Sequence, residues 1–348
     1  PWNAPMFTCA WQLAPAIAAG NGVVLKPSEM TPFSSIAVAM LLERSGLPRG
    51  LINIVNGVGP TTGAALTGHA GIAKLVFVGS PESGRRIAQA GAERLVPSVL
   101  ELGGKSANIV FADARHDDAV AGAQAAIFAA AGQSCVAGSR LLVQREAFDE
   151  VCERLARAAG EIAVGLPSDE ATLMGPVQNA RQHQHIVSMI ESARQRGARL
   201  LCGGHRPQGL PQEASGYFLA PTVLVDVTED MAIAQEEVFG PVVVVMPFDA
   251  EEDAVRLANA TRFGLAGAVW TQDPARAHRV ASRLRAGTVW INSYKAINVM
   301  SPFGGFGDSG FGRSSGVEGL KEYTVTQSVW VETAISASVA MGYGNGVG

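Results

Sequence analysis

The segment KLVFVGSPESG covers residues 74–84 and passes from an apolar run, through a glycine turn, into polar residues. The apolar run at 74–78 predicts a buried β-strand, because it is short and ends at turn residues. Gly79 and Ser80 then predict the start of a helix that continues through Gly84 to residue 90. A strand followed directly by a helix is the repeating unit of sheets with parallel strands.

The same alternation continues on both sides of this segment. Upstream, strands are predicted at 22–26 and 52–55, and a helix opens between them at Thr31-Pro32. Downstream, strands are predicted at 140–143, 242–246 and 288–291, and helices at 117–131, 146–163, 180–197, 251–259 and 274–285. This order predicts an α/β fold with a doubly wound, Rossmann-like sheet.

Length and composition limit the classes of protein to which the chain can belong. Its 348 residues are enough for about two domains. Hydrophobic residues make up 47% and charged residues 17%, which excludes a mainly disordered state. The formal net charge of -4 gives no basic surface for nucleic acid or an anionic membrane. No apolar run reaches the ~18 residues of a membrane span. We therefore expect the chain to bind neither nucleic acid nor a membrane.

Cysteines and histidines form no pattern that is typical of a metal site. The four cysteines, at positions 9, 135, 152 and 202, contain no C-x-x-C pair, and the six histidines supply no matching ligand set. We therefore assign no metal. Cysteines without a pairing pattern are typical of a reducing compartment, so we expect a cytoplasmic protein.

Three polar residues stand where catalytic groups are often found. Cys135 ends the segment GQSC, in which a glycine turn can expose the thiol and nearby amides can favour its thiolate. Glu101 ends an apolar strand, at the edge where open α/β sheets bind ligands. Asn3 stands between two prolines and offers a neutral donor suited to an oxyanion. Taken singly, each also has a structural explanation: a buried thiol, a surface carboxylate and a turn asparagine.

Seven motifs in a common order carry a resemblance to the NAD(P)-dependent aldehyde dehydrogenase family, from residue 1 to about residue 333. They are PWNAP at 1–5, KPSE at 26–29, FVGSPESG at 77–84, ELGGK at 101–105, GQSC at 132–135, EEVFGP at 236–241 and PFGG at 302–305. Each motif is weak alone, and their shared order and spacing make the similarity strong. The chain resembles a family member that lacks its N-terminal portion.

The resemblance implies oxidation of a small-molecule aldehyde to a carboxylic acid in two stages. Cys135 would attack the aldehyde carbon, and the Asn3 side chain and the Cys135 backbone N–H would hold the oxyanion. Loss of hydride to NAD would leave a thioester on Cys135. Glu101 would then activate the water that hydrolyses it. The sequence does not name the aldehyde.

The resemblance also implies where the coenzyme binds. Lys26 and Glu29 resemble the family's contacts to the adenosine ribose, and a carboxylate at Glu29 would repel a 2′-phosphate, which favours NAD over NADP. Amides at the helix start after Ser80 suit a pyrophosphate. Glu237 and Phe239 resemble the residues that hold the nicotinamide end. The other expected coenzyme-binding residues are Ser28, Gly59, Gly79 and Leu102.

The same resemblance divides the chain into domains. Residues 1–103 would belong to the coenzyme-binding domain, 104–312 to the catalytic domain and 313–333 to a C-terminal segment. Within that segment, TQSVWVE at 326–332 would be a strand that pairs between the subunits of a homodimer or homotetramer. Residues 334–348 would form a flexible tail.

Two positions depart from the family's pattern. Ser314 follows Gly312-Arg313 where many members carry a glutamate, so proton release would rest on Glu101 alone. Small alanines at 129–131 stand where many members have aromatic residues, which favours a wider tunnel and a bulky or branched aldehyde.

Other interpretations stay open. In a CoA-acylating member of the same family, a thiol would take the acyl group, and Glu101 argues against this because such a transfer needs no water-activating base. A truncated chain without an ordered coenzyme site would only bind or oligomerise. The pattern GFGDSG at 305–310 matches a dinucleotide-binding fingerprint in its letters, but it follows no clear strand, so we do not expect it to bind NAD.

Overall fold

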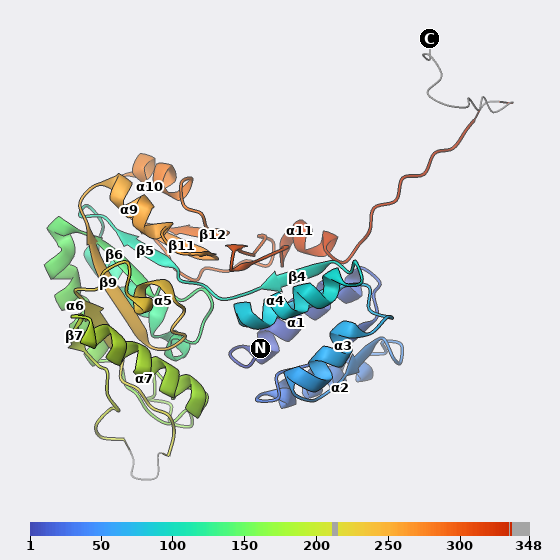
Figure 1. Ribbon diagram of the computed structural model, residues 1–348, viewed down its shortest axis with the longest axis horizontal. Helices are drawn as coiled ribbons and strands as arrows, with labels where there is room; N and C mark the ends of the chain where they lie inside the picture. Colours follow the sequence, from blue (N-terminus) through green and yellow to red (C-terminus); the bar gives the residue numbers. More distant parts are fainter. Residues whose placement is uncertain (211–214, 334, 336–348) are drawn as a thin grey trace.

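A computed structural model describes residues 1–210, 215–333 and 335 of the chain. Figure 1 shows two regions that long connecting segments join. One region is built on a broad sheet, and the other contains the N-terminal helices α1 to α4.

The N-terminal region alternates short strands with helices, as the sequence predicts. Its strands pair in parallel, β1 with β2 and β3 with β4. The strands are β1 (Val23–Leu25), β2 (Ile52–Ile54), β3 (Leu75–Val78) and β4 (Ser98–Glu101). The helices are α1 (Pro5–Ala18), α2 (Pro32–Arg44), α3 (Ala64–Gly68) and α4 (Pro81–Ala92), with a π-helical turn at Gly59–Gly63 before α3.

The strand-to-helix turn at 74–84 forms as its residues predict. The Ser80 side chain caps α4 by accepting a hydrogen bond from the Ser83 backbone N–H at 3.3 Å. Pro81 follows at the start of the helix, where its missing N–H removes no helical hydrogen bond. A Cβ at Gly84 would come within 2.6 Å of the Leu102 side chain. The glycine therefore lets α4 pack closely against the residues that follow β4.

The broad sheet contains seven strands in the order β12-β11-β5-β6-β9-β8-β7. The strands are β5 (Ala107–Val110), β6 (Arg140–Gln144), β7 (Arg199–Cys202), β8 (Thr222–Val225), β9 (Val242–Phe248), β11 (Ala266–Trp270) and β12 (Thr288–Ile291). Neighbouring strands are parallel except β7 and β8, which are antiparallel. This is the α/β architecture that the sequence predicts.

Two apolar cores lie on this sheet. One contains Ala123 of α5 and Leu155 of α6, and the other contains Ile186 of α7 and Val280 of α10. Because both faces are buried, β9 carries a continuous apolar run rather than an alternating one. The helices around the sheet are α5 (His116–Ile127), α6 (Phe148–Gly160), α7 (Ala180–Gln195), α8 (Ala232–Gln235), α9 (Glu251–Ala258) and α10 (Pro274–Ala281).

The structure corrects several predicted elements. The helix expected at 117–131 ends at Ile127, because Ala130 and Ala131 adopt left-handed backbone angles that an α-helix cannot contain. The strands β5, β7, β8 and β11 are not predicted from the sequence. Each has only four or five residues, and a run this short can be told from a helix only where flanking turn residues mark it clearly, as Gly79 does after β3.

After the broad sheet, the chain returns to the N-terminal region. The short strand β13 (Phe306–Gly307) pairs with β10 (Phe263–Gly264), and β14 (Gly310–Phe311) adds antiparallel to β4. These strands contain the GFGDSG pattern, which therefore lies in antiparallel strands outside any βαβ unit. The following helix α11 (Gly316–Lys321) lies against α1. The domain boundaries at 103 and 312 stay predictions.

The C-terminal segment differs from the prediction within the single chain, because no strand forms at 326–332. Figure 1 shows this segment running away from the rest of the molecule, and Val329 and Trp330 are 74% and 93% exposed. A strand is defined by hydrogen bonds to a neighbour, and pairing between subunits stays a prediction. The predicted tail at 334–348 lies outside the described residues, apart from Ile335.

Candidate active site

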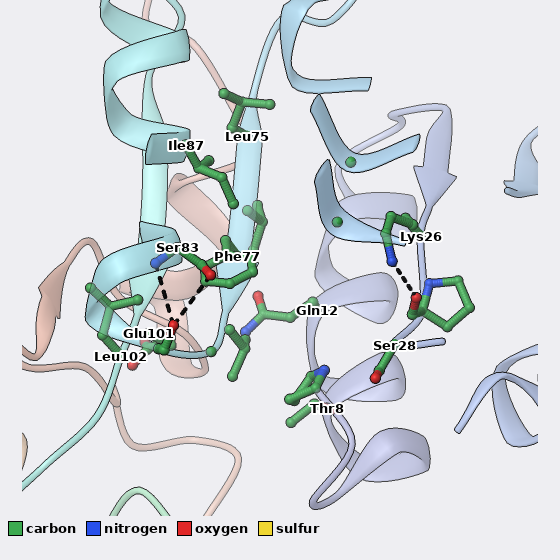
Figure 2. Close-up of a pocket in the computed structure, with 18 of the residues that line it drawn as sticks. Thr8, Gln12, Lys26, Ser28, Leu75, Phe77, Ser83, Ile87, Glu101 and Leu102 are labelled. Carbon is green, nitrogen blue, oxygen red and sulfur yellow. Dashed lines mark hydrogen bonds between the residues drawn. The ribbon is translucent and has the colours of Figure 1, made fainter. Parts of the chain in front are cut away.

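The residues predicted from the sequence line one groove of about 2740 Å³. Figure 2 shows Lys26 and Ser28 on one side of it, and Ser83, Glu101 and Leu102 on the other. The predicted residues in its lining are Asn3, Lys26, Ser28, Glu29, Gly59, Gly79, Ser80, Glu101, Leu102, Cys135, Glu237 and Phe239. Residues that are far apart in the sequence therefore share one site.

Glu101 is the last residue of β4 and is only 5% exposed. Its Oε1 accepts a hydrogen bond from the Ser314 hydroxyl at 3.1 Å, whereas its buried Oε2 has no hydrogen-bond partner among the described residues. Burial raises the pKa of the carboxyl group to about 8, although Ser314 and Arg313 lower it. A carboxyl with this pKa can exchange a proton near neutral pH, as a general base must.

Cys135 follows a strained turn that directs the chain into the groove. Ala130 and Ala131 have φ angles of 55° and 52°, and Gly132 has a φ of 69°. Such left-handed angles are unfavourable for alanine and available to glycine. A Cβ at Gly132 would lie 1.9 Å from the carbonyl oxygen of Gly240, so only glycine fits there.

The Gln133 side chain ties this turn to its surroundings. Its Nε2 donates a hydrogen bond to the Ala130 carbonyl at 3.1 Å, and its Oε1 accepts one from the Gln178 backbone N–H at 2.8 Å. No role for Gln133 is predicted from the sequence. Its place inside the GQSC motif was the available signal, but its partners become visible only in three dimensions.

Asn3 reaches the cysteine turn from the residues that precede α1. Its Nδ2 donates a hydrogen bond to the Gln133 carbonyl at 3.0 Å. An amide nitrogen carries two N–H donors, and this bond uses one of them. The other is the kind of donor that an oxyanion beside Cys135 would need.

Backbone amides favour the thiolate of Cys135, as expected, but burial and nearby carboxylates outweigh them and raise the pKa of the thiol. Burial and the negative charges of Glu237 and Glu101 raise its pKa to about 12. The backbone amides of Val136 and Cys135 lower the pKa, but their effect is smaller. A base must therefore accept the thiol proton before the sulfur can attack.

Glu237 approaches the groove beside the two glycines of the ELGGK motif. Its Oε1 accepts a hydrogen bond from the Gly104 backbone N–H at 3.0 Å. A Cβ at Gly103 would lie 2.2 Å from the Glu237 Oε2, and a Cβ at Gly104 would lie 2.4 Å from the Cys135 carbonyl oxygen. The glycines thus permit close approach of both segments. Burial raises the pKa of Glu237 to about 7, although Gly104 and Lys105 lower it.

Phe239 packs against Trp2 with the ring centroids 5.3 Å apart and the ring planes at 89°. The Gln182 Nε2 donates hydrogen bonds to the carbonyl groups of Val238 and Phe239 at 2.9 and 3.0 Å. These contacts join the EEVFGP segment to the PWNAP segment and to α7. The sequence does not predict the roles of Trp2 and Gln182, because both depend on elements far away in the chain.

The other end of the groove carries groups that suit a dinucleotide. The Lys26 Nζ donates a hydrogen bond to the Pro27 carbonyl at 2.8 Å and lies 3.7 Å from the Glu29 Oε2. Ser80 marks the N-terminus of α4, where backbone amides attract phosphate. A Cβ at Gly59 would meet no atom within 4 Å, so the chain leaves open space there.

Neither a metal centre nor a membrane-crossing helix appears in the described part of the chain. Residues 1–210, 215–333 and 335 contain no group of three His, Cys, Asp or Glu side chains placed to hold a metal ion. In the same residues, no helix combines the length and apolar character that crossing a membrane requires.

Comparison with known proteins connects this geometry to a family. The model of the aldehyde dehydrogenase family matches residues 1–329. Retinal dehydrogenase 2 from Homo sapiens is 45% identical over 333 residues, which are 95% of this chain and 63% of that protein. Betaine aldehyde dehydrogenase from Rhizobium johnstonii is 44% identical over 330 residues, which are 95% of this chain and 67% of that protein.

Solved structures show the same similarity. The NAD+ complex of an aldehyde dehydrogenase from Bacillus cereus has a TM-score of 0.93 at 42% identity, covering 96% of this chain and 67% of that one. The chain thus spans 63–67% of the length of these relatives. A family match along residues 1–329, together with the predicted site residues gathered in one groove, shows that the chain belongs to the aldehyde dehydrogenase family.

Proposed function

We propose that this chain provides the catalytic and coenzyme-binding residues of an NAD-dependent aldehyde dehydrogenase that releases a free carboxylic acid. The observation that carries the proposal is the convergence of Cys135, Asn3 and Glu101 with a dinucleotide-like set of groups in one groove. Relatives named retinal dehydrogenase and betaine aldehyde dehydrogenase support an aldehyde as the substrate.

The first step forms a bond between the Cys135 Sγ and the carbonyl carbon of the aldehyde. The thiol proton has to leave first, since a pKa of about 12 keeps the thiol neutral at pH 7. Glu101 and Glu237 are the nearby carboxylates that could accept it, with pKa values of about 8 and 7. Charge then develops on the aldehyde oxygen, which the Asn3 amide and the Cys135 backbone N–H would stabilise.

The second step needs an acceptor for the hydride that leaves the former aldehyde carbon, and NAD supplies this acceptor when bound. The residues present fit the coenzyme. Lys26 and the N-terminus of α4 would hold the ribose and pyrophosphate, and Glu237 and Phe239 would hold the nicotinamide end. The carboxylate of Glu29 would accept from ribose hydroxyls and repel a 2′-phosphate, which supports NAD over NADP.

The third step hydrolyses the thioester on Cys135. Water adds to the acyl carbon while Glu101 takes its proton, the carbon–sulfur bond breaks, and Cys135 recovers a proton as the acid leaves. Glu101 suits this task because it lines the groove and its Oε2 has no hydrogen-bond partner among the described residues.

A CoA-acylating enzyme is the second candidate. It would pass the acyl group to a thiol and would need no water-activating base, so the buried carboxyl of Glu101 favours the hydrolytic reaction. An excess of free acid over acyl-CoA, measured with CoA present, would support hydrolysis.

Further features belong to the same proposal. Residues 1–103 would form the coenzyme-binding domain, 104–312 the catalytic domain, and 326–332 a strand between the subunits of a homodimer or homotetramer. The small residues at 129–131 favour a wide tunnel and a bulky or branched aldehyde. The four free cysteines agree with a reducing, cytoplasmic compartment.

The proposal is tested by Cys135→Ala in the native protein that carries this chain. NADH formation from a panel of aliphatic, aromatic and semialdehyde substrates should fall at least about a thousandfold, or ~4 kcal/mol in transition-state stabilisation. Matched alanine variants of Cys9, Cys152 and Cys202 should keep most activity. A thermal shift with NAD should persist in Cys135→Ala, which separates loss of the nucleophile from loss of the fold. Retained turnover in this variant would overturn the mechanism.

A further inference from the structure

Three hydrogen bonds connect Glu101 to a tyrosine on another part of the chain. The Tyr323 hydroxyl donates to the Gln12 Oε1 at 2.8 Å, and the Gln12 Nε2 donates to the Ser314 Oγ at 2.8 Å. The Ser314 hydroxyl then donates to the Glu101 Oε1 at 3.1 Å. Figure 2 shows Gln12 on its helix facing the wall that carries Glu101. We call Tyr323, Gln12 and Ser314 the glutamate array.

Every donor in the glutamate array points toward Glu101. A hydroxyl has one hydrogen to donate, and Ser314 uses it on the carboxyl because it accepts from the Gln12 amide. The Gln12 amide presents its NH₂ group to Ser314 because the Tyr323 hydroxyl donates to its carbonyl oxygen. Aligned hydrogen bonds of this kind polarise one another and favour the ionised form of the final acceptor.

The far end of the glutamate array is held in place independently of the array. The Asn21 Nδ2 donates to the Tyr323 carbonyl at 2.9 Å and to the Ala16 carbonyl at 3.1 Å. The neighbouring Glu322 forms an ion pair with Lys74 at 2.7 Å. Two separate contacts thereby hold the end of α11, one through Asn21 after α1 and one through Lys74 before β3.

We propose that Tyr323, Gln12 and Ser314 are positioning residues that orient Glu101, occupying its Oε1 and leaving its Oε2 as the basic atom in the groove. This inference rests on the proposed function, in which Glu101 activates water. The glutamate array orients the carboxyl rather than carrying protons away, because the Gln12 amide neither gains nor loses a proton near neutral pH.

Other ionisable groups near Glu101 also change its pKa or have their own pKa changed by its charge. Arg313 lowers the pKa of the Glu101 carboxyl. Cys135 and Tyr323 have their own pKa values raised in part by the negative charge of Glu101. Without the Tyr323 hydroxyl, the Gln12 amide can rotate by half a turn. Its oxygen then accepts the hydrogen bond that the Ser314 hydroxyl otherwise donates to Glu101. Glu101 would then lose the hydrogen bond from Ser314, and its pKa would rise.

The test follows the protonation of Glu101 directly, in the ligand-free native protein. The infrared carbonyl band of the protonated carboxyl is assigned by its loss in Glu101→Gln and is then titrated with pH. Tyr323→Phe and Gln12→Leu should each move the midpoint upward by about one pH unit, a tenfold fall in the acid dissociation constant. Ser314→Ala should do the same, and Ser314→Thr should restore the original midpoint by returning a hydroxyl.

Asn21→Ala is the matched control, because it removes a hydrogen bond to the Tyr323 backbone carbonyl but keeps the three side-chain hydrogen bonds of the glutamate array and the Glu322–Lys74 ion pair. The midpoint of the Glu101 infrared titration in this variant should equal that of the unaltered protein. The pH profile of kcat should move with the infrared midpoint in the array variants, while the KM for NAD stays constant.

Unmoved midpoints in both Tyr323→Phe and Gln12→Leu would overturn the proposal. An equal shift in Asn21→Ala would also overturn it, since a general loosening of α11 would then explain the effect. If the unaltered protein oxidises no aldehyde, the proposed function fails, yet the infrared titration still reports whether the glutamate array acts on Glu101.

Discussion

Glu29 lies at the end of the groove where an adenosine ribose would bind, beside Lys26. Its side chain stays half exposed, and its Oε2 is 3.7 Å from the Lys26 Nζ. A negative charge in this position disfavours a second negative charge on the ribose. The choice between the two coenzymes would then rest on one carboxylate.

Glu29→Ser should therefore move the coenzyme preference toward NADP. The serine removes the repulsion of the 2′-phosphate and keeps a hydroxyl that can contact the ribose. The measurement is the ratio of kcat/KM for NADP to that for NAD. Glu43→Ser on α2 removes an exposed carboxylate outside the groove and should leave the ratio unchanged. An unchanged ratio in Glu29→Ser, with both coenzymes still binding, would show that another group determines the preference between NAD and NADP.

The sequence predicts which side chains line the groove. It predicts the protonation states of these side chains less well. Asn3, Glu101 and Cys135 stand in motifs whose order is readable in the chain. Their pKa values depend on burial and on neighbouring charges from distant segments, which no local pattern contains. The amides near Cys135 favour its thiolate as expected, but burial and the charges of Glu237 and Glu101 raise the pKa of the thiol more than the amides lower it.

The turn between α5 and Cys135 is the element on which the site depends most. It combines two alanines and one glycine with left-handed backbone angles, held by the Gln133 side chain. An alanine-rich stretch predicts a continuous helix, which is why the sequence places the helix end too late. The hydrogen bonds of the Gln133 side chain to Ala130 and Gln178 oppose that propensity.

Gly132→Ala should destabilise the protein and reduce activity together. The added methyl would lie 1.9 Å from the Gly240 oxygen, and the φ of 69° is costly for alanine. We expect a loss of roughly 1–3 kcal/mol in the free energy of unfolding, measured by urea denaturation.

Gly160→Ala in α6 is the matched control, since a Cβ there meets no atom within 4 Å. It should be neutral or slightly stabilising, because alanine favours helices. Equal stability of the two variants would mean that the turn tolerates a side chain at position 132.

Elements with a clear local pattern are the ones that could be read from the sequence. The periodic patterns of α6 and α7 indicate helices, and the turn residues Gly79 and Ser80 mark the end of the short apolar strand β3. The pairing of β14 with β4 and the contact of α11 with α1 are long-range, and no local signal specifies them. The glutamate array depends on these same long-range contacts.

At the scale of the whole molecule, every residue from 324 to 333 is exposed. Val325, Val329, Trp330 and Val331 are all more than 70% exposed. Apolar side chains on an extended segment are prone to pair with another strand. This exposure supports the proposed pairing between subunits.

Val329→Asp should therefore weaken assembly of the native protein. A charge within the paired strand would have to be buried without a partner, so the mass measured by light scattering should fall toward that of smaller species. Val317→Asp on α11 changes a similarly exposed valine outside the segment and should leave the mass unchanged. A monomeric mass for the unaltered protein would contradict the pairing itself.

The central claim is that Glu101 activates water after the acyl group has been attached to Cys135. In Glu101→Gln, the side chain keeps its size and loses its basicity. The variant should give a single burst of NADH, one per active site, because Glu237 remains to accept the thiol proton. Steady turnover should fall by ~10²–10⁴, the usual contribution of a general base.

The most direct measurement is mass spectrometry of the intact Glu101→Gln protein after it has been mixed with NAD and an aldehyde. The account predicts an acyl group that accumulates on Cys135 while turnover stops, and Glu318→Gln on the surface of α11 should show neither effect. Undiminished turnover with no acyl-enzyme would contradict the account, because water would then be activated elsewhere.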